Sequence, residues 1–389
     1  MRLFKMNNSI IKKLSCIVHS LDYQLILLVI ALSGTGMLIM YSAGYDNGLR
    51  FFHHGRNILI ALTILFIVAM IPTKWISMAS PYIYMVGVLL LFAVLLFGIT
   101  RKGAQRWVNV GIVIQPSEIL KIGAPLMLAW WFHYREKAYK VVDFIVAFIL
   151  LCIPFFLIAM QPDLGTSLLV LAAGLTVIFF AGLSWKIVIP IFFIGFVGIS
   201  MIIFFEERLC QDGGSWYLLR DYQRTRVCTL LDPTKDPLGR GFHILQSMIA
   251  IGSGGIWGKG FMAGTQTHLE FIPERTTDFI FAAYSEEFGL FGNVILLLLM
   301  LMLVWKGLHI ALKASDQFSR LIATAISMIF FTYSFVNIGM VSGILPVVGV
   351  PLPFISYGGT AMVTLGLALG ILMSISRESK QKYKKIKLI

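Results

Sequence analysis

Long apolar runs separated by short polar segments make up most of the chain. Seven of these runs contain no Asp, Glu, Lys or Arg and come close to or exceed the roughly 20 residues with which a helix crosses a hydrocarbon core of about 30 Å. They predict membrane spans at residues 23–43, 57–73, 75–100, 144–162, 164–185, 187–205 and 288–305.

The region 321–376 carries no charge, but prolines and glycines interrupt it between Gly343 and Gly359. Such residues end helices, and non-helical backbone at membrane depth is tolerated where protein buries it. The region therefore predicts two spans joined by a re-entrant loop. The segment 118–134 predicts another span, with Glu118 and Lys121 near its mouth. The expected fold is an all-α polytopic membrane protein with about ten transmembrane helices in a single domain, 1–389.

Composition and charge agree with this fold and set its orientation. Hydrophobic residues make up 58% of the chain and charged residues 13%, which excludes a water-soluble globular protein. If alternate loops face inward, most Lys and Arg residues fall on one side, and that side is cytoplasmic. The N-terminal segment 1–22 and the basic tail 377–389 are therefore expected in the cytoplasm. The sequence contains no basic soluble domain, so the net charge of +13 does not indicate nucleic-acid binding.

The largest polar segment is the loop 206–277, which this topology places outside the cytoplasm. A connector of this length is expected to carry function. Its part 243–255 is apolar with interspersed glycines and predicts a helix lying in the membrane interface; a packing lid is the alternative. Cys210 and Cys228 both lie in the loop, where a disulfide is permitted. Their spacing alone leaves two interpretations open, a disulfide or two thiols.

Asp278 lies where this loop enters the apolar segment that begins at Phe279. Desolvation raises the pKa of a carboxyl group at the edge of a membrane, and a carboxylate there can accept a proton from a substrate. A second interpretation is structural, because an acidic residue in the first turn of a helix caps it and interacts with the helix dipole. Both interpretations stay open on this residue alone.

Further charged groups are expected at the same outward mouth. Glu118 and Lys121 are three residues apart on one helix face and can form an ion pair. Basic groups here could neutralise a departing diphosphate while a carboxylate deprotonates a hydroxyl, which is the chemistry of glycosyl transfer from a lipid carrier. The sequence contains no phosphate-binding loop and no zinc-ligand spacing, and metal ligation at His53-His54 is not expected. The candidate residues at the mouth are Arg106, Glu118, Lys121, Asp163, Arg224, Arg226 and Asp278.

Long strings spread from the second span to the last resemble the SEDS family of bacterial shape, elongation, division and sporulation proteins. Residues 337–353 and 269–274 favour its elongation-type members over the division-type members. The principal strings are Gly103-Ala104-Gln105-Arg106-Trp107, Gln115-Pro116-Ser117-Glu118, Gln161-Pro162-Asp163-Leu164-Gly165-Thr166, Asp221-Tyr222-Gln223-Arg224-Thr225-Arg226-Val227, Pro273-Glu274-Arg275-Thr276-Thr277-Asp278-Phe279, Asn337-Ile338-Gly339-Met340 and Ser356-Tyr357-Gly358-Gly359. Thr276 stands where the family commonly has His, and the two loop cysteines are not part of its pattern.

The resemblance implies a peptidoglycan glycosyltransferase that polymerises lipid II at the outer face of the bacterial cytoplasmic membrane. Asp278 matches the family's essential carboxylate, and Ser356 belongs to a matching string and is a candidate substrate-binding residue. The implied partners are the growing glycan strand, a class B penicillin-binding protein that cross-links it, and other proteins of the elongation complex. A divalent cation, Mg or Mn, is associated with the family and is expected on the lipid diphosphate rather than in a protein cage. The alternatives are a lipid II flippase and a noncatalytic scaffold.

Overall fold

The computed structural model describes residues 21–45, 48–101, 104–109, 113–135, 139–205, 210, 221–233, 239–269, 271–272 and 274–387. The expectations for residues 1–20 of the N-terminal segment, for the remaining positions of the loop 206–277 and for the last two residues of the tail lie outside the described residues.

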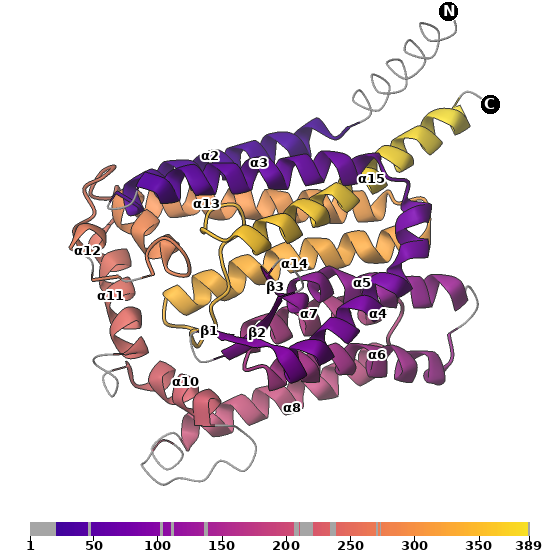
Figure 1. Cartoon of the computed structure of the whole chain (residues 1–389), viewed down its shortest axis with the longest axis horizontal. Coiled ribbons are helices and arrows are strands. Elements are labelled where there is room, and N and C mark those ends of the chain that lie inside the picture. Colours follow the sequence, from indigo (N-terminus) through magenta and orange to yellow (C-terminus); the bar gives the residue numbers. More distant parts are fainter. Residues whose placement is uncertain are drawn as a thin grey trace, which may run out of the picture.

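Ten long helices form the described part of the molecule, and they run side by side along its long axis (Figure 1). Seven are long and apolar enough to cross a membrane, and α5, α7 and α8 complete the ten expected spans. The all-α membrane fold is therefore confirmed. The helices are α2 (Tyr23–Ala43), α3 (Gly48–Met70), α4 (Thr73–Phe97), α5 (Pro116–Arg135), α6 (Val141–Met160), α7 (Leu164–Phe180), α8 (Trp185–Phe204), α13 (Ile280–Leu312), α14 (Gln317–Val341) and α15 (Gly359–Lys387).

Helix α15 packs closely along α3 because its glycines allow the two backbones to approach. A Cβ atom on Gly366 would lie 2.4 Å from the carbonyl oxygen of Ala61, and one on Gly370 would lie 2.9 Å from that of Leu65. Small residues commonly permit such approaches between membrane helices. The contact fixes the N-terminus of α15 next to the outward half of α3.

Helix α13 differs from the predicted span 288–305. It begins at Ile280 and is broken at Gly289, whose φ of 62° is a left-handed conformation that favours glycine. A preceding loop satisfies the interrupted backbone, since Leu290 N donates to Gly255 O (2.9 Å) and Lys259 N donates to Glu286 O (3.0 Å). The prediction placed the start of the helix too late because Glu286 and Glu287 read as polar; both are buried inside the protein.

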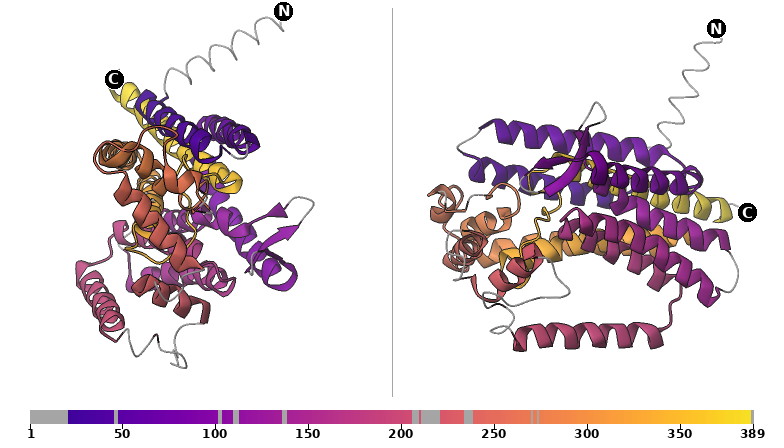
Figure 2. Two further views of the ribbon diagram at one scale, coloured as in Figure 1. Left: turned by 90° about the vertical axis from the view of Figure 1, so that its left-hand side faces the viewer. Right: turned by 60° about the horizontal axis from the view of Figure 1, so that its bottom comes forward.

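A small antiparallel sheet on the outward side was not predicted. It consists of β1 (Ile99–Arg101), β2 (Ala104–Asn109) and β3 (Val113–Ile114), in the order β1-β2-β3. Its strands are short, which makes them hard to recognise from sequence. Figure 2 shows the sheet projecting from the helices.

In its described residues, the loop between α8 and α13 carries the helices α10 (Asp221–Leu231), α11 (Arg240–Ser253) and α12 (Thr265–His268). Helix α11 confirms the helix predicted at residues 243–255, although it begins three residues earlier, at Arg240. Figure 1 shows these helices at one end of the bundle, while the start of α2 and the end of α15 lie at the other end. This arrangement agrees with both termini lying on the side opposite the loop.

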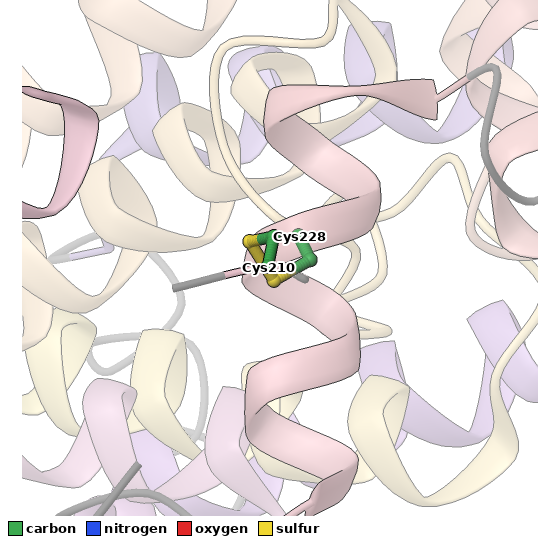
Figure 3. The surroundings of a disulfide bond; sticks show 2 residues. All are labelled: Cys210 and Cys228. Atoms are coloured by element: carbon green, nitrogen blue, oxygen red, sulfur yellow. A yellow bond between two sulfur atoms is a disulfide. The ribbon is translucent and has the colours of Figure 1, made fainter. Parts of the chain in front are cut away.

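A disulfide joins Cys210 to Cys228 on α10 (Figure 3), so of the two interpretations left open by the spacing the structure has the bonded one. The two residues are 18 positions apart.

Removal of this disulfide should destabilise the protein. Closing a loop of this length lowers the entropy of the unfolded chain by an amount equivalent to about 3 kcal/mol. We expect nonreducing mass spectrometry to detect the linked peptides, and the Cys210→Ser, Cys228→Ser double variant to unfold at lower temperature. Cys152→Ser is the control, because Cys152 has no disulfide partner. Quantitative maleimide labelling of both loop cysteines in intact cells would contradict the bonded state.

Candidate active site

Asp278 lies at the outward end of α13, two residues before the helix begins. The N-cap position is Phe279 and the first turn contains no acidic residue, so the interpretation of Asp278 as a first-turn cap is wrong. Its side chain is partly exposed, whereas the residues that follow it, Phe279 and Ile280, are buried. The carboxylate therefore stands at the boundary between solvent and the apolar interior, where a substrate can reach it.

Asn337 on α14 binds the backbone of Asp278, and Gly349 in the α14–α15 loop lies directly against its side chain. Asn337 is fully buried and its Nδ2 donates to the carbonyl oxygens of Asp278 (2.9 Å) and Val350 (2.7 Å). A Cβ atom on Gly349 would lie 3.3 Å from Asp278 Oδ2, and its φ of +73° favours glycine. The loop therefore runs directly against the carboxylate. Asn337 was not among the predicted site residues, although a lone amide in an apolar span was a usable signal.

The segment that carries Asp278 is also bound to the start of α15 and to α3. Tyr357 N donates to the carbonyl oxygen of Thr276 (2.9 Å), and Arg50 Nη1 donates to Thr276 Oγ1 (3.2 Å). Arg275 Nε donates to the carbonyl oxygen of Ala43 at the end of α2 (2.9 Å). Contacts from α2, α3 and the residues before α15 thus meet at the segment Arg275–Asp278.

Glu118 and Lys121 form the ion pair that their spacing predicts. Lys121 Nζ lies 2.6 Å from Glu118 Oε1 and 2.7 Å from the hydroxyl of Tyr333, and only 3% of its side chain is exposed. Thr364 on α15 donates to Glu118 Oε2 (3.1 Å). The pair therefore joins α5 to α14 and α15, and each charge has polar partners in a dry environment.

Arg106 and Asp163 meet at the sheet side of the mouth. Arg106 Nη1 lies 3.7 Å from Asp163 Oδ1, and Gln115 Nε2 donates to Asp163 Oδ2 (3.1 Å). Asp163 also caps α7 by accepting from Thr166 N (3.4 Å). These contacts give Arg106 and Asp163 a structural role in holding β2 against α7.

The remaining predicted residues lie on α10 and in the α14–α15 loop. Arg224 and Arg226 are on α10, which Figure 1 places beside α8, on the side of the molecule away from α2 and α3. Ser356 is buried, and its hydroxyl accepts from Leu352 N (2.8 Å) inside the α14–α15 loop. Ser356 thus belongs to the loop that runs against Asp278, and its hydroxyl is used inside that loop.

A cavity of about 470 Å³ opens between α3, α4, α5 and α15. Its wall is almost wholly apolar. The lining residues are Asn57, Ile83, Ile114, Gln115, Glu118, Ile119, Ile122, Leu126, Gly359, Thr360, Val363, Thr364 and Leu367.

Among the residues that the structure describes, no three His, Cys, Asp or Glu side chains lie together as a metal site would require. The residues present do not form a protein cage for a divalent cation, and we derive no step of the reaction through one.

The sequence profile of the cell cycle proteins FtsW, RodA and SpoVE matches residues 23–381. The chain belongs to this family. It is 47% identical to the peptidoglycan glycosyltransferase MrdB of Escherichia coli K12 over 371 residues, which cover 95% of this chain and 96% of that protein. It is 33% identical to the stage V sporulation protein E of Bacillus subtilis, with 92% and 98% covered. Family membership and the apolar helices together make it a multi-pass protein of the bacterial cytoplasmic membrane.

Solved structures of the family share this fold. A chain from a structure that describes the coordination of polymerization and crosslinking by a peptidoglycan synthase complex is 30% identical, with a TM-score of 0.76 and coverage of 93% of this chain and 99% of that chain. The rod shape determining protein RodA of Thermus thermophilus is 25% identical, with a TM-score of 0.66 and coverage of 92% and 97%.

Proposed function

We propose that this protein is a peptidoglycan glycosyltransferase that polymerises lipid II into glycan strands during cell elongation. The names of its relatives support this activity, and one structural observation carries it. Asn337 binds the backbone of Asp278 at the outward mouth, and the segment that carries Asp278 is bound to the residues just before α15, whose first turns line the apolar cavity. A carboxylate on a segment linked in this way to the wall of an apolar cavity suits a substrate with a sugar headgroup and a long hydrocarbon chain.

In this proposal Asp278 acts as the general base. Its carboxylate accepts the proton of the sugar 4-hydroxyl of the incoming lipid II, while that oxygen bonds to the anomeric carbon at the end of the growing strand. The bond from this carbon to the diphosphate oxygen breaks, and undecaprenyl diphosphate leaves with the electron pair. Arg224 and Arg226 of α10 stay the candidates for stabilising the departing diphosphate.

A flippase is the main alternative, and the two buried carboxylates of α13 argue against it. Glu286 is fully buried and accepts from Lys259 Nζ (2.7 Å), Gln266 N (2.9 Å) and Thr265 Oγ1 (3.0 Å). Glu287 is bound by the hydroxyl of Ser42. These charges hold a loop in place and are therefore poorly suited to accompany a polar headgroup across the membrane.

A class B penicillin-binding protein is the proposed partner. The support is the similarity to a chain from a peptidoglycan synthase complex that couples polymerization to crosslinking. A noncatalytic scaffold would also bind such a partner, but it would not depend on Asp278.

Proteoliposomes separate these functions. We expect the purified protein, reconstituted with fluorescent lipid II, to convert the labelled lipid to polymer and to release undecaprenyl diphosphate in proportion. Movement of intact lipid II to the opposite leaflet, measured with a membrane-impermeant quencher and without polymer, would support the flippase instead. The absence of both signals in the presence of the partner would support the scaffold.

A further inference from the structure

The α14–α15 loop, residues 342–358, packs tightly between neighbouring helices. A Cβ atom on Gly165, at the start of α7, would lie 2.8 Å from the carbonyl oxygen of Val348. A Cβ atom on Gly36 of α2 would collide with the carbonyl oxygen of Phe354. Glycine at both positions therefore lets α2 and α7 contact the loop backbone directly.

The backbone conformation of the loop shows that these contacts constrain it. Phe354 is fully buried and has a φ of +61°, which is strained for a residue with a side chain. Such a conformation persists only where the surrounding structure imposes it. The loop is therefore a rigid element at the outward mouth, and it can support a neighbouring group in a fixed place.

Asn337 joins this loop to the segment that carries the proposed base. Its Nδ2 donates to the carbonyl oxygens of Asp278 (2.9 Å) and Val350 (2.7 Å). Both neighbours are acceptors, so only the amide nitrogen can face them, and it uses its two hydrogens to do so. The side chain is fully buried, and within the described part of the chain its Oδ1 has no hydrogen-bond partner. The hydrogen bonds of this side chain thus fix residue 278 relative to residue 350.

Gly349, the residue before Val350, limits the place of the carboxylate itself. A Cβ atom on Gly349 would lie 3.3 Å from Asp278 Oδ2, and the φ of this glycine is +73°. The loop therefore contacts Asp278 twice within two residues, at its main chain through Asn337 and at its carboxylate through Gly349. A third contact lies at the other end of the loop, where Tyr357 N donates to the carbonyl oxygen of Thr276 (2.9 Å).

We propose that Asn337 and Gly349 are positioning residues, through which the α14–α15 loop orients the carboxylate of Asp278 toward the attacking hydroxyl. This inference rests on the proposed function. Neither residue needs to touch the substrate, because each acts through Asp278. The missing side chain at residue 349 leaves the carboxylate the room that its productive orientation requires, and a base that is misplaced by a fraction of an ångström loses much of its effect.

Two glycines of the same loop provide a matched test. Gly343 also has a φ of +73°, so alanine causes similar backbone strain at residues 343 and 349. A Cβ atom on Gly343 would meet Met248 Sδ at 2.9 Å, at the end of a flexible side chain on α11. Gly349→Ala and Gly343→Ala are purified in detergent, and the rate of polymer formation is measured over a range of lipid II concentrations, together with the unfolding temperature.

We expect Gly349→Ala to lower kcat by at least about tenfold and to leave KM within about twofold, because the added methyl displaces the base but not the substrate. Gly343→Ala should keep kcat within about twofold of the wild-type value. The unfolding temperatures of the two variants should fall by similar amounts. An equal loss of kcat in both variants would overturn the proposal, and so would an effect of Gly349→Ala on KM alone.

Hydrogen exchange tests the amide contact without turnover. In the full-length Asn337→Ala protein, we expect faster exchange in peptides that cover residues 276–282 and 349–352, because the bond between the two segments is lost. Asn293→Ala is the control, since the Asn293 side chain accepts from Ser285 Oγ (2.9 Å) on the same helix. Unchanged exchange in both segments of Asn337→Ala would overturn the role of Asn337. A wild-type protein that never polymerises lipid II, with the exchange differences as expected, would refute the proposed function and leave this contact standing.

Discussion

The Asp278→Asn variant is expected to lose polymerisation activity by about 10²–10⁴-fold, which is the usual contribution of a positioned general base. Asparagine has nearly the size of aspartate but cannot accept the proton of the attacking hydroxyl. The backbone contact from Asn337 to the carbonyl oxygen of residue 278 does not depend on the side chain, so the fold should persist. Polymer formed from lipid II by purified protein is the measurement, with the unfolding temperature recorded alongside.

Asp316→Asn is the matched control for this change. Asp316 caps α14 by accepting from Ser319 N, and asparagine caps a helix about as well. This variant should therefore keep both activity and stability. Full activity of Asp278→Asn would show that Asp278 is not the base.

The Lys121→Ala variant is expected to be the most destabilised of the single substitutions considered. It removes the ion-pair partner of a buried carboxylate, Glu118, and a hydrogen-bond partner of Tyr333. Breaking a buried ion pair by removing one charge typically costs about 3–5 kcal/mol. We expect a lower unfolding temperature and a loss of activity together, measured on purified protein.

The Glu118→Gln, Lys121→Ala double variant should recover part of this stability, because no unpaired charge remains. Lys380→Ala is the matched control: its ion pair with Asp22 is 46% exposed on the lysine side, so its loss should cost about 0–1 kcal/mol. A Lys121→Ala protein that is fully stable but inactive would contradict a structural role and place Lys121 in the substrate site.

The charge-free apolar runs predicted the membrane helices well, because bilayer thickness sets the length of a membrane helix. The prolines and glycines in 343–358 correctly marked the loop before α15. The prediction failed where tertiary partners override local polarity. Glu286 is buried because Lys259 and the start of α12 surround its carboxylate. Lys259 lies 27 residues earlier in the sequence, and the backbone donors Gln266 and Thr267 lie 20 and 19 residues earlier. No local pattern contains that information.

The candidate site was predicted only in part. Asp278 stood out because a carboxylate at the entrance to an apolar helix is unusual, and the spacing of Glu118 and Lys121 indicated their pairing. Asn337 and Gly349 were missed because their importance lies in what the fold brings next to them, the carbonyl and carboxylate oxygens of Asp278. Such neighbours depend on helix packing, which the sequence pattern does not specify.

The most direct test of the central claim is polymerisation of lipid II by this protein alone. The protein is purified in detergent, incubated with lipid II in the absence of any other transferase, and the products are separated by length. Our account predicts glycan polymer together with one undecaprenyl diphosphate released for each bond formed, and neither product from the Asp278→Asn variant. Polymer formed equally by wild type and variant, or no polymer from the wild-type protein with its transpeptidase partner also present, would contradict it.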